Sequence, residues 1–453
     1  MEREYTFEIS FNTEDSVDSF KPENPRPNEK WYNATLKIIN NEIFIIIPYK
    51  PEFYRGFSNW KPTINWNKFG SYIEINNAKQ NPGVIDISFK EAKLLGNSYE
   101  NSVTLKVDWV RIDLEPDNEE TDTGVFYLND AGFKFVHKFY NPIFPNIDNN
   151  YKPTRRGEDY YSIEESNYRP EFEYDYSDSV NKSKIKIVKN PFLKFNYKNI
   201  LENNSIHFAD VVCRAVSFYY ERYIDYSFAR ICLSKKKIII KKTLPQQIGY
   251  SDLGISRLMY IGNSWGIHKF LSSNWHIAFI SHYTILSKSI NNYLHANIVE
   301  GSSTFLILYS IIEFIKSAAP KKNKVNDKFN IIASRKEMKG VCNVAYTILL
   351  KLIPKNEYPE FEKKWVAVIG NLKYKTMKSI IEELFIENQL NCDEFPIKIE
   401  RLIKIRNYFV HGGKIEIEQE ELDKANYLLY EITAILILNL MGINDWNKYR
   451  IKE

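Results

Sequence analysis

Hydrophobic and polar residues follow two different periods along the chain. The first half holds short runs of β-branched and aromatic residues separated by Gly, Pro and Asn, among them ATLKII, EIFIII, SYIEI, VIDISF, SVTLKVDWVRIDL, GVFYL, FKFVHKF and KIKIVK. Such runs predict strands. The polar pair Asn40-Asn41 between ATLKII and EIFIII predicts a hairpin, because Asn tolerates a positive φ. We therefore expect a β-rich domain, sandwich-like or barrel-like, over residues 1–250.

Three segments add detail to this expected domain. The segment from about residue 140 to 182 is rich in Pro, Asn, Tyr and acidic residues without a sustained period, which predicts a long loop. Residues 207–226 have the pattern of a helix that packs on the sheet. The stretch ARICLSKKKIIIKK then predicts a second hairpin.

From about residue 265 the apolar residues recur at helical spacing. They do so in NWHIAFISHYTILSKSINNYL, SSTFLILYSIIEFIKSA, SRKEMKGVCNVAYTILLKLI, KYKTMKSIIEELFIENQL, PIKIERLIKIRNYFVH and QEELDKANYLLYEITAILILNLMG. This pattern predicts an all-α bundle over residues 265–453. Pro245 and three glycines between residues 249 and 262 place the boundary between the two domains at about 245–265. The expected fold class is α+β.

Composition is that of a globular protein, with 44% hydrophobic and 26% charged residues in 453. No apolar run reaches the 18 or so residues that a membrane helix requires, and the N-terminus MEREYTFEIS has no apolar stretch of the signal-peptide kind. We expect a cytoplasmic protein with no membrane partner. The four cysteines lack CxxC spacing, so they predict neither disulfides nor a zinc site, and no Gly-rich phosphate loop or Ser-His-Asp arrangement is evident.

The basic charge of the chain is concentrated in its second half. Residues 265–453 hold 26 Lys and Arg against 21 Asp and Glu, and residues 316–378 alone hold 15 against 5. This segment is a candidate phosphate-binding surface, with the lysines Lys321, Lys322, Lys324, Lys363, Lys364, Lys373 and Lys375. A solvated basic face without a ligand is the alternative. The interleaved aromatics Tyr358, Phe361, Trp365 and Tyr374 fit base stacking and core packing equally well.

The stretch RLIKIRNYFVHGG, residues 401–413, combines several polar groups at the end of one predicted helix. Pro396 suits the first turn of that helix. Arg406 falls at the same angular position as an apolar stripe made of Ile399, Leu402, Ile403, Phe409 and Val410. A guanidinium on such a face needs an anionic partner because it cannot lose its proton. That partner is a carboxylate such as Glu313, or a phosphate of a ligand.

Asn407 and His411 lie one helical turn apart, so the amide can hydrogen-bond the imidazole and fix its tautomer. Gly412-Gly413 predict a left-handed helix cap. His411 then lies in the last turn, where the helix dipole favours the imidazolium. The alternative is an ordinary helix terminus, in which His411 caps carbonyls and Arg406 forms a buried ion pair.

The segment RNYFVHGG, followed by one further long helix, resembles the Arg-x4-6-His signature of the HEPN superfamily, including the polar residue after the Arg. Within that superfamily the chain is most similar to the ApeA-like proteins of bacterial anti-phage defence. The supporting features are the apolar helix FLILYSIIEF with Glu313 and the preceding helix around Trp275. The resemblance covers roughly residues 265–445. The first half is similar in kind to the N-terminal domain of ApeA-like proteins through the hairpin around ATLKII.

The resemblance implies a metal-independent endoribonuclease without cofactor that cleaves tRNA or other cellular RNA, a toxin of antiviral abortive infection. Arg406 and His411 match the signature pair, Asn407 matches the polar residue beside the Arg, and Glu313 matches an acidic position in an earlier helix. HEPN domains form homodimers in which two motifs face each other. The β-rich domain is then expected to sense a phage-derived trigger. The alternative is a catalytically inactive HEPN module, either antitoxin-like or a scaffold that binds protein or nucleic acid.

RNA cleavage without metal uses the neighbouring 2′-OH as nucleophile, and it needs a base, an acid and a cation for the phosphorane. We expect His411 to act as general acid or base and Arg406 to stabilise the phosphate, with Asn407 orienting the imidazole.

Overall fold

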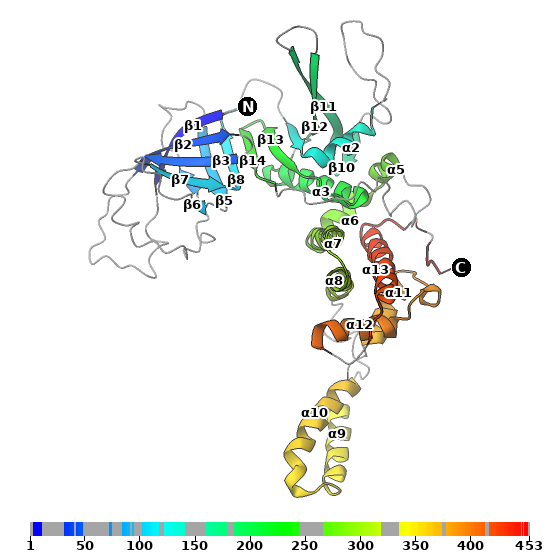
Figure 1. The fold of residues 1–453 in the computed structure, drawn as a ribbon. Helices are drawn as coiled ribbons and strands as arrows, with labels where there is room; N and C mark the ends of the chain where they lie inside the picture. Colours follow the sequence, from blue (N-terminus) through cyan, green and yellow to red (C-terminus); the bar gives the residue numbers. More distant parts are fainter. Residues whose placement is uncertain are drawn as a thin grey trace, which may run out of the picture. The chain divides into compact units, whose positions relative to one another are not determined.

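A computed structural model describes most of the second half of the chain and the strands of the first half. The described residues are 3–10, 31–39, 42–48, 72–74, 84–90, 93–94, 102–116, 122–140, 160–178, 185–198, 200–244, 266–318, 335–373, 377–412, 416–444, 446 and 448–451. The chain divides into two compact units (Figure 1). The first contains residues 1–248 and 267–272, and the second contains residues 249–266 and 273–453.

The first unit contains a five-stranded antiparallel sheet with the order β1-β2-β3-β7-β6. Its strands are β1 (Arg3–Ser10), β2 (Trp31–Ile39), β3 (Glu42–Pro48), β6 (Lys93–Leu94) and β7 (Ser102–Val107). Strands β2 and β3 pair from Ile39 opposite Glu42 onward. The hairpin that ATLKII and EIFIII predict is therefore confirmed, although Asn40 and Asn41 lie outside the described residues.

A second antiparallel sheet has the order β10-β11-β12-β9-β13-β14-β8-β5-β4. Its strands are β4 (Tyr72–Glu74), β5 (Val84–Lys90), β8 (Trp109–Leu114), β9 (Thr123–Leu128), β10 (Tyr161–Ile163), β11 (Ser166–Asp178), β12 (Ile185–Asn196), β13 (Tyr226–Cys232) and β14 (Lys237–Lys242). The predicted hairpin over ARICLSKKKIIIKK is confirmed as β13 and β14. In both β9 and β14 several side chains are fully buried, including Phe126 and Ile240, which places the core of this unit against the middle of the sheet.

The loop expected over residues 140–182 is wrong where the structure forms β10 and β11. Buried Tyr168 and Phe172 alternate with exposed or half-exposed polar residues along β11, which is the period of a half-buried strand. Pro170 had argued against a strand. Pro170 lies opposite Leu193 of β12, beyond the point where the described pairing of β10 with β11 ends at Tyr168, and a strand tolerates proline where one side of the ladder has ended.

The strand expected at FKFVHKF is also wrong, because residues Asp130–His137 form helix α2. Asn129 caps this helix, with its side chain accepting a hydrogen bond from the Gly132 amide at 3.3 Å. Phe135 is fully buried while Phe133 is 37% exposed. FKFVHKF therefore forms part of a helix despite its apparent alternation, and the signal for the helix start is Asn129, which precedes this stretch in the sequence.

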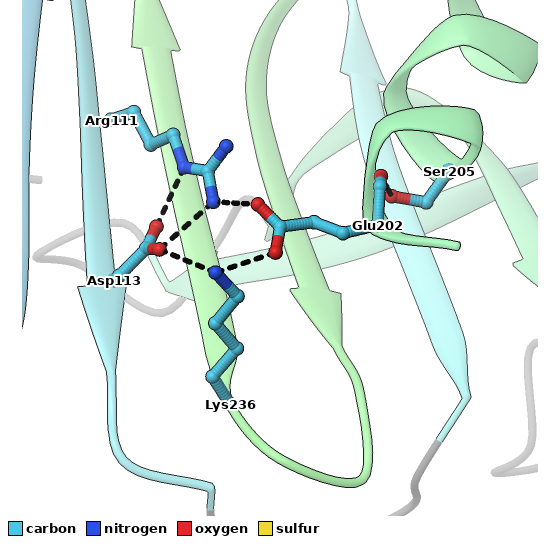
Figure 2. Close-up of polar contacts among 5 residues, drawn as sticks. All are labelled: Arg111, Asp113, Glu202, Ser205 and Lys236. Carbon is cyan, nitrogen blue, oxygen red and sulfur yellow. Dashed lines mark hydrogen bonds and ion pairs between the residues drawn. The ribbon is translucent and has the colours of Figure 1, made fainter. Parts of the chain in front are cut away.

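Helix α3 (Glu202–Tyr220) confirms the helix predicted near residues 207–226 and begins earlier than expected. Its first residue joins a four-charge cluster with β8 and the turn before β14, which we call the quartet: Arg111, Asp113, Glu202 and Lys236 (Figure 2). The Asp113 carboxylate accepts hydrogen bonds from Arg111 Nε at 2.6 Å and Lys236 Nζ at 2.8 Å. Glu202 pairs with both cations, so the quartet ties the start of α3 to the sheet.

The second unit is built from helices. They are α6 (Trp275–Ser281), α7 (Tyr283–Ala296), α8 (Ser302–Ala318), α9 (Arg335–Leu350), α10 (Tyr358–Lys373), α11 (Met377–Glu387), α12 (Ile399–His411) and α13 (Gln419–Leu440), with short 3-10 turns η3 (Lys355–Glu357) and η4 (Cys392–Glu394). A further helix, α5 (Ile267–Ser272), belongs to the first unit. The chain thus combines antiparallel sheet with helices, which confirms the mixed composition of the predicted class. Among the described helices none is long and apolar enough to cross a membrane.

Candidate active site at the end of helix α12

Helix α12 is fixed on three sides. Its buried face consists of Ile399, Leu402 and Ile405. Lys378 of α11 forms an ion pair with Glu400 at 2.5 Å. On the side of α13, Arg401 Nε donates to Glu421 Oε1 at 2.5 Å, and a second guanidinium nitrogen binds the same carboxylate. Because these contacts come from separate helices, they define both the direction and the rotation of α12.

The buried face of α12 differs from the predicted stripe near the helix end. Ile405 is fully buried, whereas Val410 is 47% exposed. Pro396 lies before the first turn, which starts at Ile399. Phe409 does contact the core, since its ring lies edge-on to Phe305 of α8 at 5.9 Å. The last turn of α12 therefore rests on α8 through one aromatic contact and leaves its other side exposed.

Arg406 lies at the edge of this buried face and pairs with Glu313 of α8. Its Nη2 donates to Glu313 Oε1 at 3.1 Å. The side chains of Arg406 and Glu313 are 24% and 34% exposed. Of the two partners that the sequence left open, a carboxylate or a ligand phosphate, the structure shows the carboxylate. Both side chains of the pair are thus partly exposed to solvent.

His411 is the last residue of α12 and lies beside the same guanidinium. Arg406 Nη1 is 3.3 Å from His411 Nε2. A guanidinium can only donate, so a hydrogen bond across this distance has His411 Nε2 as its acceptor. Gly412 follows with φ +68°, a conformation that favours glycine, and its amide donates to the Tyr408 carbonyl at 3.0 Å. The helix therefore stops at His411 and leaves the imidazole exposed.

Asn407 occupies a different position from the one predicted. Its Oδ1 accepts from Arg406 Nη1 at 3.4 Å, and among the described residues no hydrogen bond joins it to His411. The expected orientation of the imidazole by the Asn407 amide is thus not formed in this structure. Arg406 makes that contact instead, because its longer side chain spans the turn between the two residues.

Tyr309, which no sequence pattern singled out, lies beneath the Arg406–Glu313 pair. It precedes Glu313 by one turn of α8, is 2% exposed and stacks on Phe305 at 5.9 Å. Burial raises the pKa of its phenol to about 12, the Glu313 carboxylate adds to the rise, and Arg406 opposes it. The only available sequence signal was the i, i+4 spacing of Tyr309 and Glu313 on an apolar helix.

The predicted lysines are only partly covered by the described residues. Lys363 and Lys364 are exposed on α10, and Lys364 pairs with Glu360 at 2.8 Å. Lys373 ends the same helix, and Lys321, Lys322, Lys324 and Lys375 lie outside the described residues. Among the interleaved aromatics, Phe361 stacks on Tyr346 of α9 with ring centroids 5.7 Å apart, and the Trp365 ring lies tilted against Tyr346 at 6.0 Å. These two rings hold the α9–α10 hairpin together.

Within the described part of the chain, no group of three or more His, Cys, Asp or Glu side chains is arranged to hold a metal ion. None of the four cysteines forms a disulfide, and Cys213 and Cys342 are buried. His268, for its part, bonds Tyr161 Oη through Nδ1 at 2.7 Å within the first unit.

Comparison with known proteins adds no further identification. The chain matches no family model, no curated protein and no solved structure. The interpretation of the site therefore rests on its own residues and on the signature resemblance.

Proposed function

We propose that this protein is a metal-independent endoribonuclease of the HEPN type that acts in anti-phage abortive infection. The observation that carries the proposal is the position of Arg406, a half-exposed cation that contacts Glu313 on one side and His411 on the other. A base and a permanent cation within one hydrogen bond of each other are the groups that 2′-OH attack on a phosphodiester needs.

In this proposal His411 Nε2, which accepts from Arg406 at rest, takes the proton of the 2′-OH. The hydroxyl oxygen attacks the adjacent phosphorus, and Arg406 neutralises the charge that develops on the phosphorane oxygens. The P–O5′ bond then breaks, and the leaving oxygen takes a proton from an imidazolium. The products are a 2′,3′-cyclic phosphate and a 5′-hydroxyl, so no water or metal takes part in the bond-making step.

One chain supplies a single His411, yet the reaction uses a base and an acid. A homodimer with twofold symmetry brings a second His411 and a second Arg406 to the same phosphate. The exposure of His411 and of Val410 beside it is compatible with this arrangement. We propose that the helical unit is a HEPN bundle that dimerises through the α12 end.

The remaining parts of the proposal assign roles along the chain. The first unit is the sandwich-like or barrel-like domain that senses a phage-derived trigger. The lysines between residues 316 and 378 bind the backbone of a cytoplasmic RNA, for which tRNA is a candidate, and their contribution weakens with salt.

The test is cleavage of bulk cellular RNA by the purified protein in EDTA, beside Arg406→Ala and His411→Ala. Loss of one phosphate-stabilising donor should reduce the rate by about 10²–10³, and loss of the base by about 10²–10⁴. The matched control is Arg401→Ala, which removes an arginine of the same helix that pairs with Glu421 instead of Glu313. A 2′,3′-cyclic phosphate end that all variants produce equally would refute the assignment.

A second candidate is an inactive HEPN module that binds a partner or nucleic acid. The observation that favours it is the Arg406–Glu313 pair itself, because a guanidinium already neutralised by a carboxylate is the arrangement of a structural ion pair. Under this alternative, overexpression does not slow growth, and His411→Ala changes nothing. Toxicity that His411→Ala relieves would exclude it.

A further inference from the structure

The Tyr309 hydroxyl is one of several buried polar groups in the second unit without a hydrogen-bond partner among the described residues, and it is the one nearest in sequence to Glu313. Among the residues that the structure describes, no side chain or backbone group hydrogen-bonds Tyr309 Oη, and the atom is buried. A buried hydroxyl without a partner costs roughly 1–3 kcal/mol, which core tyrosines normally avoid. Replacement by Phe would remove this cost, so the presence of the hydroxyl at this position calls for a use in another state of the site.

The Tyr309 phenol is placed next to the Arg406–Glu313 pair. Tyr309 and Glu313 lie four residues apart on α8, on the same helix face. The charges of both Glu313 and Arg406 act on the pKa of the phenol. In the resting structure the Glu313 carboxylate has Arg406 as its donor, and the phenol has none.

This arrangement changes when Arg406 engages a phosphate. The guanidinium then leaves Glu313 for the ligand, and the half-buried carboxylate is left without its cation. A donor is needed at that moment, because an unpaired carboxylate at a partly buried position is costly. Tyr309 is the adjacent unoccupied donor. Lys316, one turn further along α8, places its Nζ 3.2 Å from Met377 Sδ of α11, and from there its charge also acts on Glu313.

We propose that Tyr309 is a positioning residue whose hydroxyl donates to Glu313 when Arg406 transfers to the scissile phosphate, an inference that rests on the proposed ribonuclease function. The phenol is buried and does not touch RNA. Arg406 leaves Glu313 fully only as charge develops on the phosphorane, so the Tyr309 hydroxyl lowers the free energy of the transition state and acts on the rate through Glu313.

The first test separates this role from a structural one. Tyr309→Phe should lower kcat about tenfold, the equivalent of one hydrogen bond to a charged group, with KM unchanged. In a Glu313→Ala background, which removes the acceptor, the same substitution should have no further effect, because both groups act through one contact. The matched control is Tyr168→Phe, a substitution in the first unit at a phenol that is also fully buried and also has no hydrogen-bond partner among the described residues. It should leave kcat unaltered.

The second test needs no RNA and keeps the inference independent of the enzyme activity. In the unaltered protein Tyr309→Phe should leave Tm unchanged or raise it, because an unpaired hydroxyl is removed. In the Arg406→Ala background, where Glu313 has lost its cation, the same change should lower Tm by about 2–4 °C. Equal changes of Tm on Tyr309→Phe in both backgrounds would refute the proposed hydrogen bond from Tyr309 to Glu313. If the unaltered protein does not cleave RNA but Tyr309→Phe still lowers Tm only in the Arg406→Ala background, the proposed ribonuclease function is refuted. The Tyr309–Glu313 hydrogen bond is then still supported.

Discussion

The quartet of charges in the first unit makes a quantitative prediction about stability. Asp113 is the central member: its side chain is 7% exposed, and it accepts from Arg111 at 2.6 and 2.8 Å and from Lys236 at 2.8 Å. Replacing it in Asp113→Asn keeps the volume and removes the charge. Two cations, 18% and 25% exposed, then share Glu202 alone.

The magnitude follows from burial. Breaking a fully buried pair costs about 3–5 kcal/mol, and an exposed pair costs about 0–1 kcal/mol. Since both cations keep Glu202 and some solvent, we expect Asp113→Asn to lower the free energy of unfolding of the sheet by about 2–4 kcal/mol. Glu202→Gln should cost less, because that side chain is 29% exposed. Glu360→Gln, which removes a solvent-exposed pair with Lys364, should cause no measurable change.

The pH dependence has a definite sign. Burial by itself would raise the pKa of the Asp113 carboxyl, but hydrogen bonds from Arg111 and Lys236 outweigh it, and the pKa lies below its ordinary value of 3.8. A carboxyl with a depressed pKa stabilises the folded state at neutral pH and loses this contribution as pH falls through the folded-state pKa. The difference between Asp113→Asn and the unaltered protein should therefore persist at pH 5–8 and shrink below about pH 4.

The assay is amide hydrogen exchange followed by mass spectrometry on peptides from β8, β14 and the start of α3, at pH 7 and with urea. The expected result is a lower opening free energy in all three peptides and unchanged exchange in α13. The reasoning is refuted if Asp113→Asn and Glu360→Gln give the same protection, because the quartet would then be solvated like a surface pair.

Three further predictions concern the helix ends and the dimer. Gly412→Ala should destabilise the second unit by about 1 kcal/mol in urea unfolding. The cause is backbone strain at φ +68°, since no atom lies within 4 Å of the added Cβ. Gly340→Ala, inside a helix and with equally open space, should instead stabilise by about 0.5–1 kcal/mol. Asn129→Ala should lower the free energy of unfolding by about 1–2 kcal/mol in thermal melts, because it removes the α2 cap. Adding an excess of His411→Ala chains to unaltered chains should suppress cleavage if two copies share one phosphate, because a mixed dimer holds a single imidazole. Cleavage that stays proportional to the amount of unaltered chain would argue against a shared site.

The sequence predicted periodic elements well and irregular ones poorly. Helices such as α8 and α13 were predictable because their apolar residues recur every three or four positions over four or more turns. The strand β11 was not, since its alternation is carried by tyrosines and acids around Pro170, and composition outweighed period. Helix α2 was missed because its alternating Phe residues imitate a strand, and Asn129 had to be recognised as the cap.

At the site, the sequence was informative about residue identity and less so about contacts. Arg406 and His411 were found through the spacing of a known signature, and Glu313 through an acidic residue on an apolar helix. The predicted Asn407–His411 hydrogen bond is not formed, because Arg406, which precedes Asn407, contacts both residues through its Nη1, and the i, i+4 rule does not include this longer reach. Tyr309 could not be found at all, since a buried unpaired hydroxyl is a property of tertiary packing and has no local sequence pattern.

The contact between Lys316 and Met377 has a consequence for engineering. These residues lie near the end of α8 and at the start of α11, and their side chains meet at 3.2 Å. The chain from residue 319 to 376 therefore leaves and returns at neighbouring points, as inserted modules do. A short linker could close this gap, because loop closure between adjacent ends is inexpensive. Such a shortened protein would keep Glu313, Arg406 and His411 while lacking helices α9 and α10, so the proposed cleavage site and the proposed RNA-binding lysines become separable in one chain.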